Sequence, residues 1–227
     1  MADRRAFLEH FDGPYADFWK DQTRRYGHDE GHQRLIDLVS SFVPEGGLVL
    51  DCGMGNGFPF TLAWSARHRL AGCDLSTRAL TLAREGLLGG AGTRLAAGDL
   101  RELPFRTGAA PVVVCARALN YVPETFQALA ELWRVTAPGG QLVFDAFNRD
   151  HPERRRGRWK AILRRPWRLL NPAPGQQHSL RIAAVLARLR GQGASIRLFD
   201  DRGSPLPQDE APWSKCTTVW IAAEKPR

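Results

Sequence analysis

The sequence has few cysteines, and their spacing excludes the usual cysteine chemistry. There are four among 227 residues, and no two of them are separated by only two residues. Pairs of the form C-x-x-C are typical of zinc sites and redox motifs, so we expect neither. All four lie within or beside apolar runs, which indicates small buried residues in a reducing compartment: Cys52, Cys73, Cys115 and Cys216.

Long apolar runs are also absent. No run approaches the length of about 20 residues that a membrane-spanning helix needs. The first five residues lack the apolar core of a signal peptide, so we expect a cytoplasmic protein. Hydrophobic residues make up 43% of the chain and charged residues 25%, as is usual for a globular protein. The length suits one domain, with or without an appendage.

Acidic residues are missing from one stretch, 154–170. Eight of the 32 basic residues lie there, and without them 24 basic residues balance 24 acidic ones. The net charge of +8 is therefore a local feature. The eight are Arg154, Arg155, Arg156, Arg158, Lys160, Arg164, Arg165 and Arg168.

The apolar residues of this basic stretch follow a helical period, which Pro166 should kink or split. A basic amphipathic helix with tryptophans suits contact with an anionic membrane surface, or a lid over a lipophilic or acidic substrate. A solvated excursion from the domain is the alternative. We rank nucleic acid lower as a partner, because only one basic patch exists.

The strongest local pattern is a glycine turn after a buried strand. Residues 48–50 predict a strand buried on both faces, Asp51 closes it, and a helix over 60–68 follows. The intervening glycines read G-x-G-x-G, which does not match the dinucleotide fingerprint G-x-G-x-x-G. A carboxylate ahead of the turn suits a ligand end with positive charge. The alternative is a turn with only a structural role.

Two further acids follow successive predicted strands. Asp74 ends a strand over 70–73 and follows Gly55 by 19 residues. This position suits a carboxylate that accepts hydrogen bonds from ribose hydroxyls, or a helix N-terminal acid. Ser76 is the expected cap of a helix over 77–85. Asp99 follows a strand over 93–97, and its carboxylate could accept a hydrogen bond from an amine.

The remaining elements alternate in the same way, as in a doubly wound sheet. We expect a helix over 31–42 before the first strand, and after Asp99 the following elements: a strand over 112–116, a helix opened by residues 120–124 and running to about 135, a strand over 141–145 after the Pro-Gly-Gly turn, a helix over 180–190 capped by Ser179, and strands over 194–199 and 217–223.

These segments together resemble the class I S-adenosylmethionine-dependent methyltransferases. The resemblance rests on residues 50–57 (LDCGMGNG), 73–76 (CDLS), 98–105 (GDLRELPF) and 137–140 (APGG), and extends over about 45–225 apart from 150–178. It implies an α/β, Rossmann-like sheet of seven mostly parallel strands, with strand seven antiparallel and helices on both faces. It also implies S-adenosyl-L-methionine as cofactor.

The resemblance assigns cofactor roles by position. The glycine turn would surround the methionine part, Asp74 would bind the ribose, and Asp99 the adenine amino group. Residues 116–117 would lie beside the reacting end of the cofactor. The implied cofactor-binding residues are Asp51, Gly53, Met54, Gly55, Gly57, Asp74, Leu75, Asp99, Leu100, Ala116 and Arg117.

The substrate side departs from the family pattern. Tyr121 stands where members often have histidine, and Ala110-Pro111 where they have Phe-Asp. Arg117 is unusual beside a sulfonium, because like charges repel, so we expect it to point to an acidic substrate group or a cofactor carboxylate. Asn148-Arg149, followed by an inserted segment, resembles ubiquinone-biosynthesis O-methyltransferases.

We expect residues 1–45 to form a helical lid segment, with Tyr15, Trp19 and Tyr26 over the pocket; in the alternative these aromatics only anchor the segment. The methyltransferase domain would then be 46–227, with a basic helical insertion at about 150–178.

His28 and His32 lie four residues apart, but not in the zinc-protease arrangement, and we expect no metal site. A base is needed only for a hydroxyl or carbon acceptor, and the candidates are His28, Tyr15, Tyr26 and Tyr121.

The predicted function is therefore in-line methyl transfer to a small molecule of lipophilic or acidic character, with peripheral membrane contact through 154–170 as an open question. Two other classes remain. One is a protein of this fold without turnover that binds membrane or RNA through the basic stretch. The other is a nicotinamide-dependent oxidoreductase, which the G-x-G-x-G spacing and Asp99 disfavour.

Overall fold

One seven-stranded sheet organises the protein. The computed structural model describes residues 9–13, 30–86, 93–153, 177–207 and 211–227. The strand order is β3-β2-β1-β4-β5-β7-β6, and β7 runs antiparallel to both of its neighbours while the other pairs are parallel. This confirms the predicted fold class. The strands are β1 (Leu48–Cys52), β2 (Arg69–Asp74), β3 (Arg94–Ala97), β4 (Ala110–Cys115), β5 (Thr136–Phe147), β6 (Ser195–Phe199) and β7 (Thr218–Glu224).

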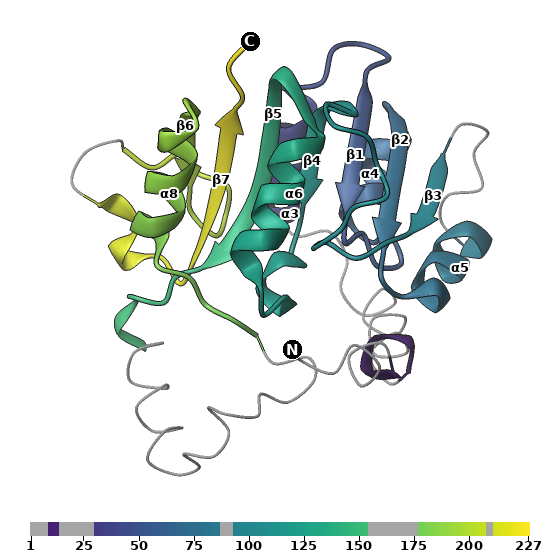
Figure 1. Ribbon diagram of the computed structural model, residues 1–227, viewed down its shortest axis with the longest axis horizontal. Helices are drawn as coiled ribbons and strands as arrows, with labels where there is room; N and C mark the ends of the chain where they lie inside the picture. The colour runs from purple at the N-terminus through teal and green to yellow at the C-terminus, as the bar shows by residue number, and fades with distance from the viewer. Residues whose placement is uncertain (1–8, 14–29, 87–92, 154–176, 208–210) are drawn as a thin grey trace.

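Helices cover both faces of this sheet (Figure 1). One apolar layer joins the sheet to α3, α4 and α5, and the other joins it to α6 and α8. The labelled helices are α3 (Glu30–Ser40), α4 (Phe60–Ser65), α5 (Thr77–Gly86), α6 (Thr125–Val135) and α8 (Ile182–Gly191); η1 (Leu119–Tyr121) and η3 (Pro212–Lys215) are short 3₁₀ turns.

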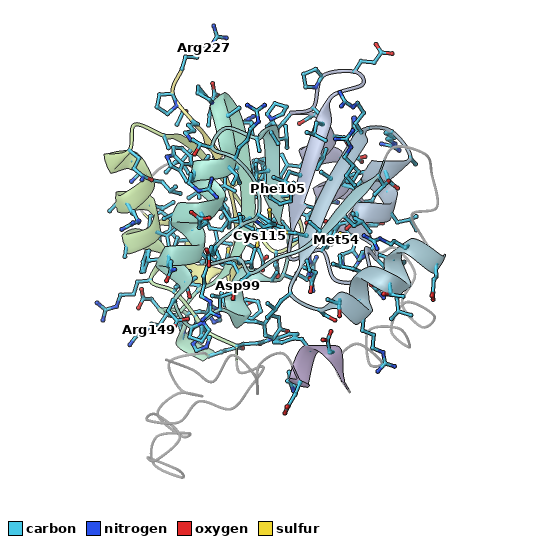
Figure 2. All side chains as sticks on the ribbon, turned by 45° about the vertical axis from the view of Figure 1, so that its right-hand side comes forward. Met54, Asp99, Phe105, Cys115, Arg149 and Arg227 are labelled. Carbon is cyan, nitrogen blue, oxygen red and sulfur yellow. The ribbon has the colours of Figure 1, made fainter. Side chains whose placement is uncertain are left out.

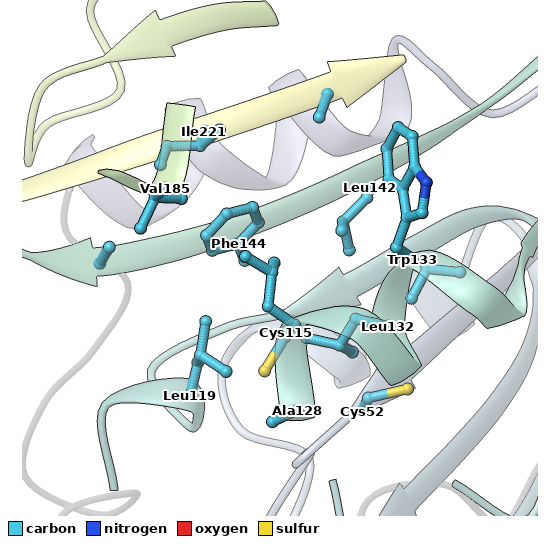
Figure 3. Packing of buried hydrophobic residues seen from close by; sticks show 14 of the residues in the cluster. Cys52, Cys115, Leu119, Ala128, Leu132, Trp133, Leu142, Phe144, Val185 and Ile221 are labelled. Atoms are coloured by element: carbon cyan, nitrogen blue, oxygen red, sulfur yellow. The ribbon is translucent and has the colours of Figure 1, made fainter. Parts of the chain in front are cut away.

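The central strands are apolar runs, and the reason is their burial on both faces. Val112, Val113 and Val114 of β4 alternate between the two layers, and each is at most 1% exposed. Figure 3 shows the layer beneath α6, where Leu132 packs near Cys52 and Cys115. Three of the four cysteines are buried and Cys216 is partly exposed, and all four are free thiols.

Two predicted helix ends were wrong. α4 ends at Ser65 rather than at 68, because the amide of Arg67 bonds the carbonyl of Trp64, only three residues back, in place of the carbonyl four residues back. Ser179 does not cap α8, which starts at Ile182 with no side-chain cap. The chain at Leu180 is extended and pairs with β5, since the Leu180 amide donates to the Phe147 carbonyl at 2.8 Å.

The fifth strand is longer than predicted. β5 starts at Thr136, so the expected turn at 137–140 is an irregularity within the strand rather than a turn before it. Thr136 pairs with Ala110, and pairing resumes between Gln141 and Val112, so extra residues are accommodated on the β5 side.

The carboxyl ends of the parallel strands meet at one edge of the sheet, the lower edge in Figure 1. A helical turn at 9–12 also lies at this edge. In Figure 2, Asp99 and Arg149 lie toward it, while Arg227 lies at the opposite end. Within the described residues, no helix has the length and apolar character needed to cross a membrane.

Candidate functional site

The glycine turn lies where the strand order reverses, because β1 has β2 on one side and β4 on the other. In open α/β sheets, ligands bind at this point, outside the carboxyl ends of the strands. The turn is held down by β2, since the Gly53 amide donates to the Cys73 carbonyl at 2.8 Å.

Two positions of the turn require glycine for different physical reasons. Gly53 has φ +82°, and a Cβ there would lie 2.3 Å from that of Ala118, so the β4 loop packs directly against it. Gly55 has φ +58°, and a Cβ there would meet no atom of the described residues within 4 Å. Among the described residues, none therefore fills the space beside Gly55.

Asp51 is a buried carboxyl group with one oxygen satisfied. It lies inside β1 rather than after it, and is 2% exposed. Its Oδ2 accepts a hydrogen bond from Thr61 Oγ1 at 2.6 Å, whereas Oδ1 has no hydrogen-bond partner in the described part of the chain. Burial raises the pKa of Asp51 to about 7, with a further increase from Asp74 and a decrease from the Thr61 hydrogen bond. An unpartnered buried oxygen of this kind fits a cationic ligand group.

Asp74 connects the ends of β1 and β2. Its Oδ2 accepts from the Gly55 amide at 2.7 Å and its Oδ1 from the Ser76 amide at 2.8 Å. Burial raises the pKa of Asp74, while these two amides lower it and Asp12 raises it. Each carboxylate oxygen has a second lone pair, so the group both shapes the turn and remains an acceptor for a ligand hydroxyl. Ser76 also caps α5, as predicted, by accepting from the Ala79 amide at 3.0 Å.

Asp99 lies two residues beyond β3, at the same edge of the sheet as Asp51 and Asp74. Its carboxylate pairs with Arg101, whose Nη2 is 2.7 Å from Oδ2. Arg101 also reaches Glu124, with 2.9 Å between Nη1 and Oε2. The sequence predicted Asp99 but gave no reason to expect Arg101 beside it.

The other predicted cofactor residues contribute unequally. Met54 and Leu100 are buried with the apolar core, which leaves their backbone atoms to act at the site. Leu75 and Ala116 are partly exposed at the carboxyl edge. Gly57 has φ +84° and its amide donates to the Met54 carbonyl, which closes the turn.

A buried polar network, which the sequence did not predict, joins the residues after β4 to β5. Asp145 of β5 is fully buried; its Oδ1 accepts from the Arg117 amide and its Oδ2 from Asn120 Nδ2 at 3.0 Å. Burial raises the pKa of Asp145 to about 6, although Arg117 and Asn120 lower it. Asn120 in turn accepts from the Phe147 amide at 2.9 Å. An acid inside an apolar strand was the available signal.

Arg117 adopts a left-handed backbone, with φ +57°, which is uncommon for a non-glycine residue. The Arg117 backbone amide donates a hydrogen bond to Asp145 Oδ1, which holds the residue in this conformation, and its side chain is exposed at the carboxyl edge. Such local strain occurs preferentially at binding sites.

His178 is a further residue of this region that the sequence did not predict. It is half-buried, and its amide donates to the Asn120 carbonyl at 2.6 Å. Burial lowers the pKa of His178, with a smaller opposing effect from Glu124. Of the four base candidates, the structure places Tyr121 beside it: Gln177 Nε2 donates to the Tyr121 hydroxyl at 2.9 Å.

Several predicted residues lie outside the described part of the chain. These are His28, Tyr15, Trp19, Tyr26 and the basic stretch 154–170. His32 lies on α3 and packs edge-on against Phe60, and the described residues include no group of metal ligands. Asn148 binds the carbonyls of Trp213 and Cys216, which gives it a structural role.

A methyltransferase domain family matches residues 50–144. Malonyl-[acyl-carrier protein] O-methyltransferase of Erwinia billingiae is 30% identical over 148 residues, 62% of this chain and 56% of the relative. Demethylmenaquinone methyltransferase of Thermobifida fusca is 33% identical over 118 residues, 51% of this chain and 49% of the relative. The chain thus spans about half the length of the curated relatives it matches.

Solved structures show the same fold at low identity. A methyltransferase from Thermotoga maritima has a TM-score of 0.64 at 15% identity, covering 96% of this chain and all of its own. The [4+2]-cyclase SpnF has a TM-score of 0.60 at 20% identity, covering 85% of this chain and 81% of its own. Since SpnF is described as a cyclase and not as a methyltransferase, the fold alone does not decide the chemistry. The chain is therefore similar to methyltransferases over residues 50–144, and its fold is that of S-adenosylmethionine-dependent methyltransferases of known structure.

Proposed function

We propose that the protein transfers a methyl group from S-adenosylmethionine to a small-molecule acceptor. The observation that carries this proposal is the unpartnered, buried Oδ1 of Asp51 next to the open glycine turn. An isolated buried acceptor is costly, and a cationic group of a ligand would satisfy it. The α-ammonium group of the cofactor is such a cation.

Each part of the cofactor has residues suited to hold it. Asp51 and the amides of the glycine turn suit the amino-acid part, Asp74 the ribose hydroxyls, and Asp99 with the Leu100 amide the adenine edge. The bound cofactor supplies a methyl group on a positively charged sulfur, which is electrophilic. The task of the chain is then to align the acceptor and exclude water, an effect that provides roughly 7–11 kcal/mol in well-oriented reactions.

The acceptor is the finer part of the proposal. The two curated relatives are named for a malonyl-carrier protein and a menaquinone precursor, one acidic and one lipophilic. The exposed side chain of Arg117 at the carboxyl edge supports an acceptor with an acidic group. We therefore propose a small acceptor of acidic or lipophilic character.

Proton removal, where the acceptor requires it, would fall to His178. Burial lowers its pKa, which keeps the imidazole neutral and able to accept a proton at pH 7. Its backbone is fixed to η1 through Asn120, beside Tyr121. The described N-terminal turn also supports the proposed lid, because Phe11 packs against Tyr121 with ring centroids 5.8 Å apart.

Heat stabilisation by a cofactor product tests the proposal. At 100 times its dissociation constant, S-adenosylhomocysteine should stabilise the protein by about 2.7 kcal/mol. For a chain of this size, that is a rise in Tm of roughly 5–10 °C. Asp74→Ala should weaken binding at least tenfold, because it removes the ribose acceptor and releases the Gly55 amide.

The matched control is Asp37→Ala, which removes an exposed carboxylate of α3 and should leave binding unchanged. A rise in Tm with a nicotinamide nucleotide, and none with S-adenosylhomocysteine, would contradict the proposal. Normal affinity in the Asp74 variant would remove the ribose assignment alone.

A further inference from the structure

A buried carboxylate holds the segment that follows β4, residues 116–121, against β5. Asp145 is fully buried, and its two oxygens accept hydrogen bonds from different residues of that segment. Oδ1 accepts from the Arg117 amide, and Oδ2 accepts from Asn120 Nδ2 at 3.0 Å. The neighbours of Asp145 in β5, Phe144 and Ala146, are buried and apolar. The core alone does not call for an acid here, so the hydrogen bonds must explain it.

The same segment also lies against the glycine turn. A Cβ at Gly53 would come within 2.3 Å of the Cβ of Ala118, so the segment and the turn are in direct contact. The segment therefore lies between the glycine turn on one side and Asp145 of β5 on the other. Its position relative to a cofactor bound at the turn is fixed from both sides.

The hydrogen bonds of this network can run in only one direction. The Phe147 amide can only donate, and it donates to Asn120 Oδ1 at 2.9 Å, which turns Asn120 Nδ2 toward Asp145. Asp145 thus faces two donors, the Asn120 side chain and the Arg117 amide. A side-chain amide at position 145 could accept from only one of them, because its nitrogen is a donor. A carboxylate is therefore required where asparagine has the same shape.

Asn120 extends the network to residues beyond β5. Its backbone carbonyl accepts from the His178 amide at 2.6 Å. The Leu180 amide, two residues further on, is held separately by the Phe147 carbonyl at 2.8 Å. Displacement of Asn120 would therefore shift His178, while the pairing of Leu180 with β5 stays in place.

Resting on the proposed function, we infer that Asp145 is the positioning residue of the acceptor side of the site. It acts through Asn120 and through the backbone of Arg117. It thereby fixes the two groups assigned to the acceptor, the guanidinium of Arg117 and the imidazole of His178. Because methyl transfer depends on the alignment of donor and acceptor, loss of this anchor should displace the acceptor groups and leave the cofactor contacts of β1 and β2 intact.

An exchange of the two side chains tests this inference. Asp145→Asn alone leaves two donors facing one acceptor. Combined with Asn120→Asp, all three hydrogen bonds can form again. The carboxylate at position 120 would accept from the Phe147 amide and from the side-chain amide at position 145, whose oxygen would accept from the Arg117 amide. The double variant also keeps the net charge of the wild-type protein, so recovery depends on hydrogen-bond direction.

Two measurements without cofactor follow the segment at pH 8, where Asp145 is ionised, since burial raises its pKa to about 6. Hydrogen exchange measured by mass spectrometry should be about fivefold faster at 117–121 and 177–178 in Asp145→Asn, as expected for one lost hydrogen bond. Reaction of the His178 imidazole with diethyl pyrocarbonate should be faster by a similar factor. Both rates should return close to the wild-type values in the double variant.

The controls lie on the cofactor side and at the opposite edge of the sheet. The affinity of Asp145→Asn for S-adenosylhomocysteine should remain close to that of the wild-type protein. His68, just before β2, should react with diethyl pyrocarbonate at the same rate in every variant. Asp37→Asn neutralises an exposed carboxylate of α3 and should alter none of these measurements. If Asp145→Asn does not fold, recovery of folding in the double variant carries the test.

Three results would overturn the inference. Unchanged exchange and labelling in Asp145→Asn would show that the carboxylate positions nothing. A double variant that is as perturbed as Asp145→Asn, or that does not fold, would show that hydrogen-bond direction is not what holds the segment. Faster labelling of His68 together with lost binding of S-adenosylhomocysteine would show a general loss of stability.

Failure of the proposed function would give a different result. The wild-type protein would then not bind S-adenosylhomocysteine, and the acceptor assignment would fall with the function. Exchange and labelling are measured without cofactor, so they would still show whether Asp145 holds residues 117–121 and 177–178.

Discussion

Asp51 shows how burial determines the state of a single residue. In solution its carboxyl group would be ionised at neutral pH, but burial raises its pKa to about 7. Because the folded pKa lies above the unfolded one, its contribution to stability is complete below about pH 4 and is lost as the pH rises through 7. Binding of a cation reverses this preference and favours the ionised form.

Cofactor binding should therefore depend on pH through Asp51. A group with a pKa near 7 is about one-tenth ionised at pH 6, so the affinity for S-adenosylhomocysteine should be about tenfold higher at pH 8 than at pH 6. Asp51→Asn should weaken binding at pH 8 and remove most of the pH dependence. Isothermal titration between pH 5.5 and 8.5 measures both effects.

Thr61→Val provides a matched variant of similar shape. It removes the hydrogen bond that lowers the pKa of Asp51, so the midpoint of the pH profile should move to higher pH. An Asp51→Asn profile that coincides with that of the wild-type protein would assign the pH dependence to another group.

At the scale of elements, the docking of the N-terminal turn is the contact with most consequence. Asp12 Oδ1 accepts from Ser76 Oγ at 2.6 Å and from the Arg78 amide at 3.3 Å, 66 residues along the chain. Asp12 therefore completes the N-terminus of α5, next to Asp74. With Phe11 against Tyr121, the turn at 9–12 connects the edges of β2 and β4.

Asp12→Ala should release this turn from α5. Loss of such a capping contact costs about 1 kcal/mol. We expect faster hydrogen exchange at residues 76–80 and 9–13, measured by mass spectrometry, with no change in α8. Arg78→Gln removes only the exposed contact to the Asp12 carbonyl and should have a smaller effect. Exchange at 76–80 that is equally slow in both variants would contradict the docking.

Element boundaries show where local sequence rules fail. Ser76 was correctly predicted as a cap because the residues that follow it form helix α5 and no strand pairing competes. Ser179 has the same local signal, but Leu180 pairs with β5 instead. The Pro138-Gly139-Gly140 segment reads as a turn, yet Thr136 pairs with Ala110 and extends the strand past it. In both cases a contact distant in sequence overrides the local preference.

At the scale of the whole molecule, two apolar layers share one sheet. Leu132 is fully buried in the layer with α6, and Ile36 is 1% exposed in the layer with α3. Because the central strands contribute side chains to both layers, neither should unfold alone.

Leu132→Ala and Ile36→Ala should each lower the free energy of unfolding by about 2–5 kcal/mol. Urea titrations followed by circular dichroism and by tryptophan fluorescence should show one shared transition in both variants. Two separated transitions in either variant would indicate layers that unfold independently. Leu62→Ala, at a partly exposed position of α4, is the control and should have a smaller effect.

The sequence by itself determined the order of strands and helices and the three strand-end carboxylates. These features follow from hydrophobic periodicity, from the positions of the glycines and from the order of segments along the chain, all of which can be read from the sequence. Only the tertiary structure decided that Arg101 reaches Glu124, that Asp145 accepts a hydrogen bond from the Arg117 amide, and that the His178 amide donates to the Asn120 carbonyl in η1. Each of the last three depends on segments that meet only after the sheet has formed, and on burial that no single segment provides.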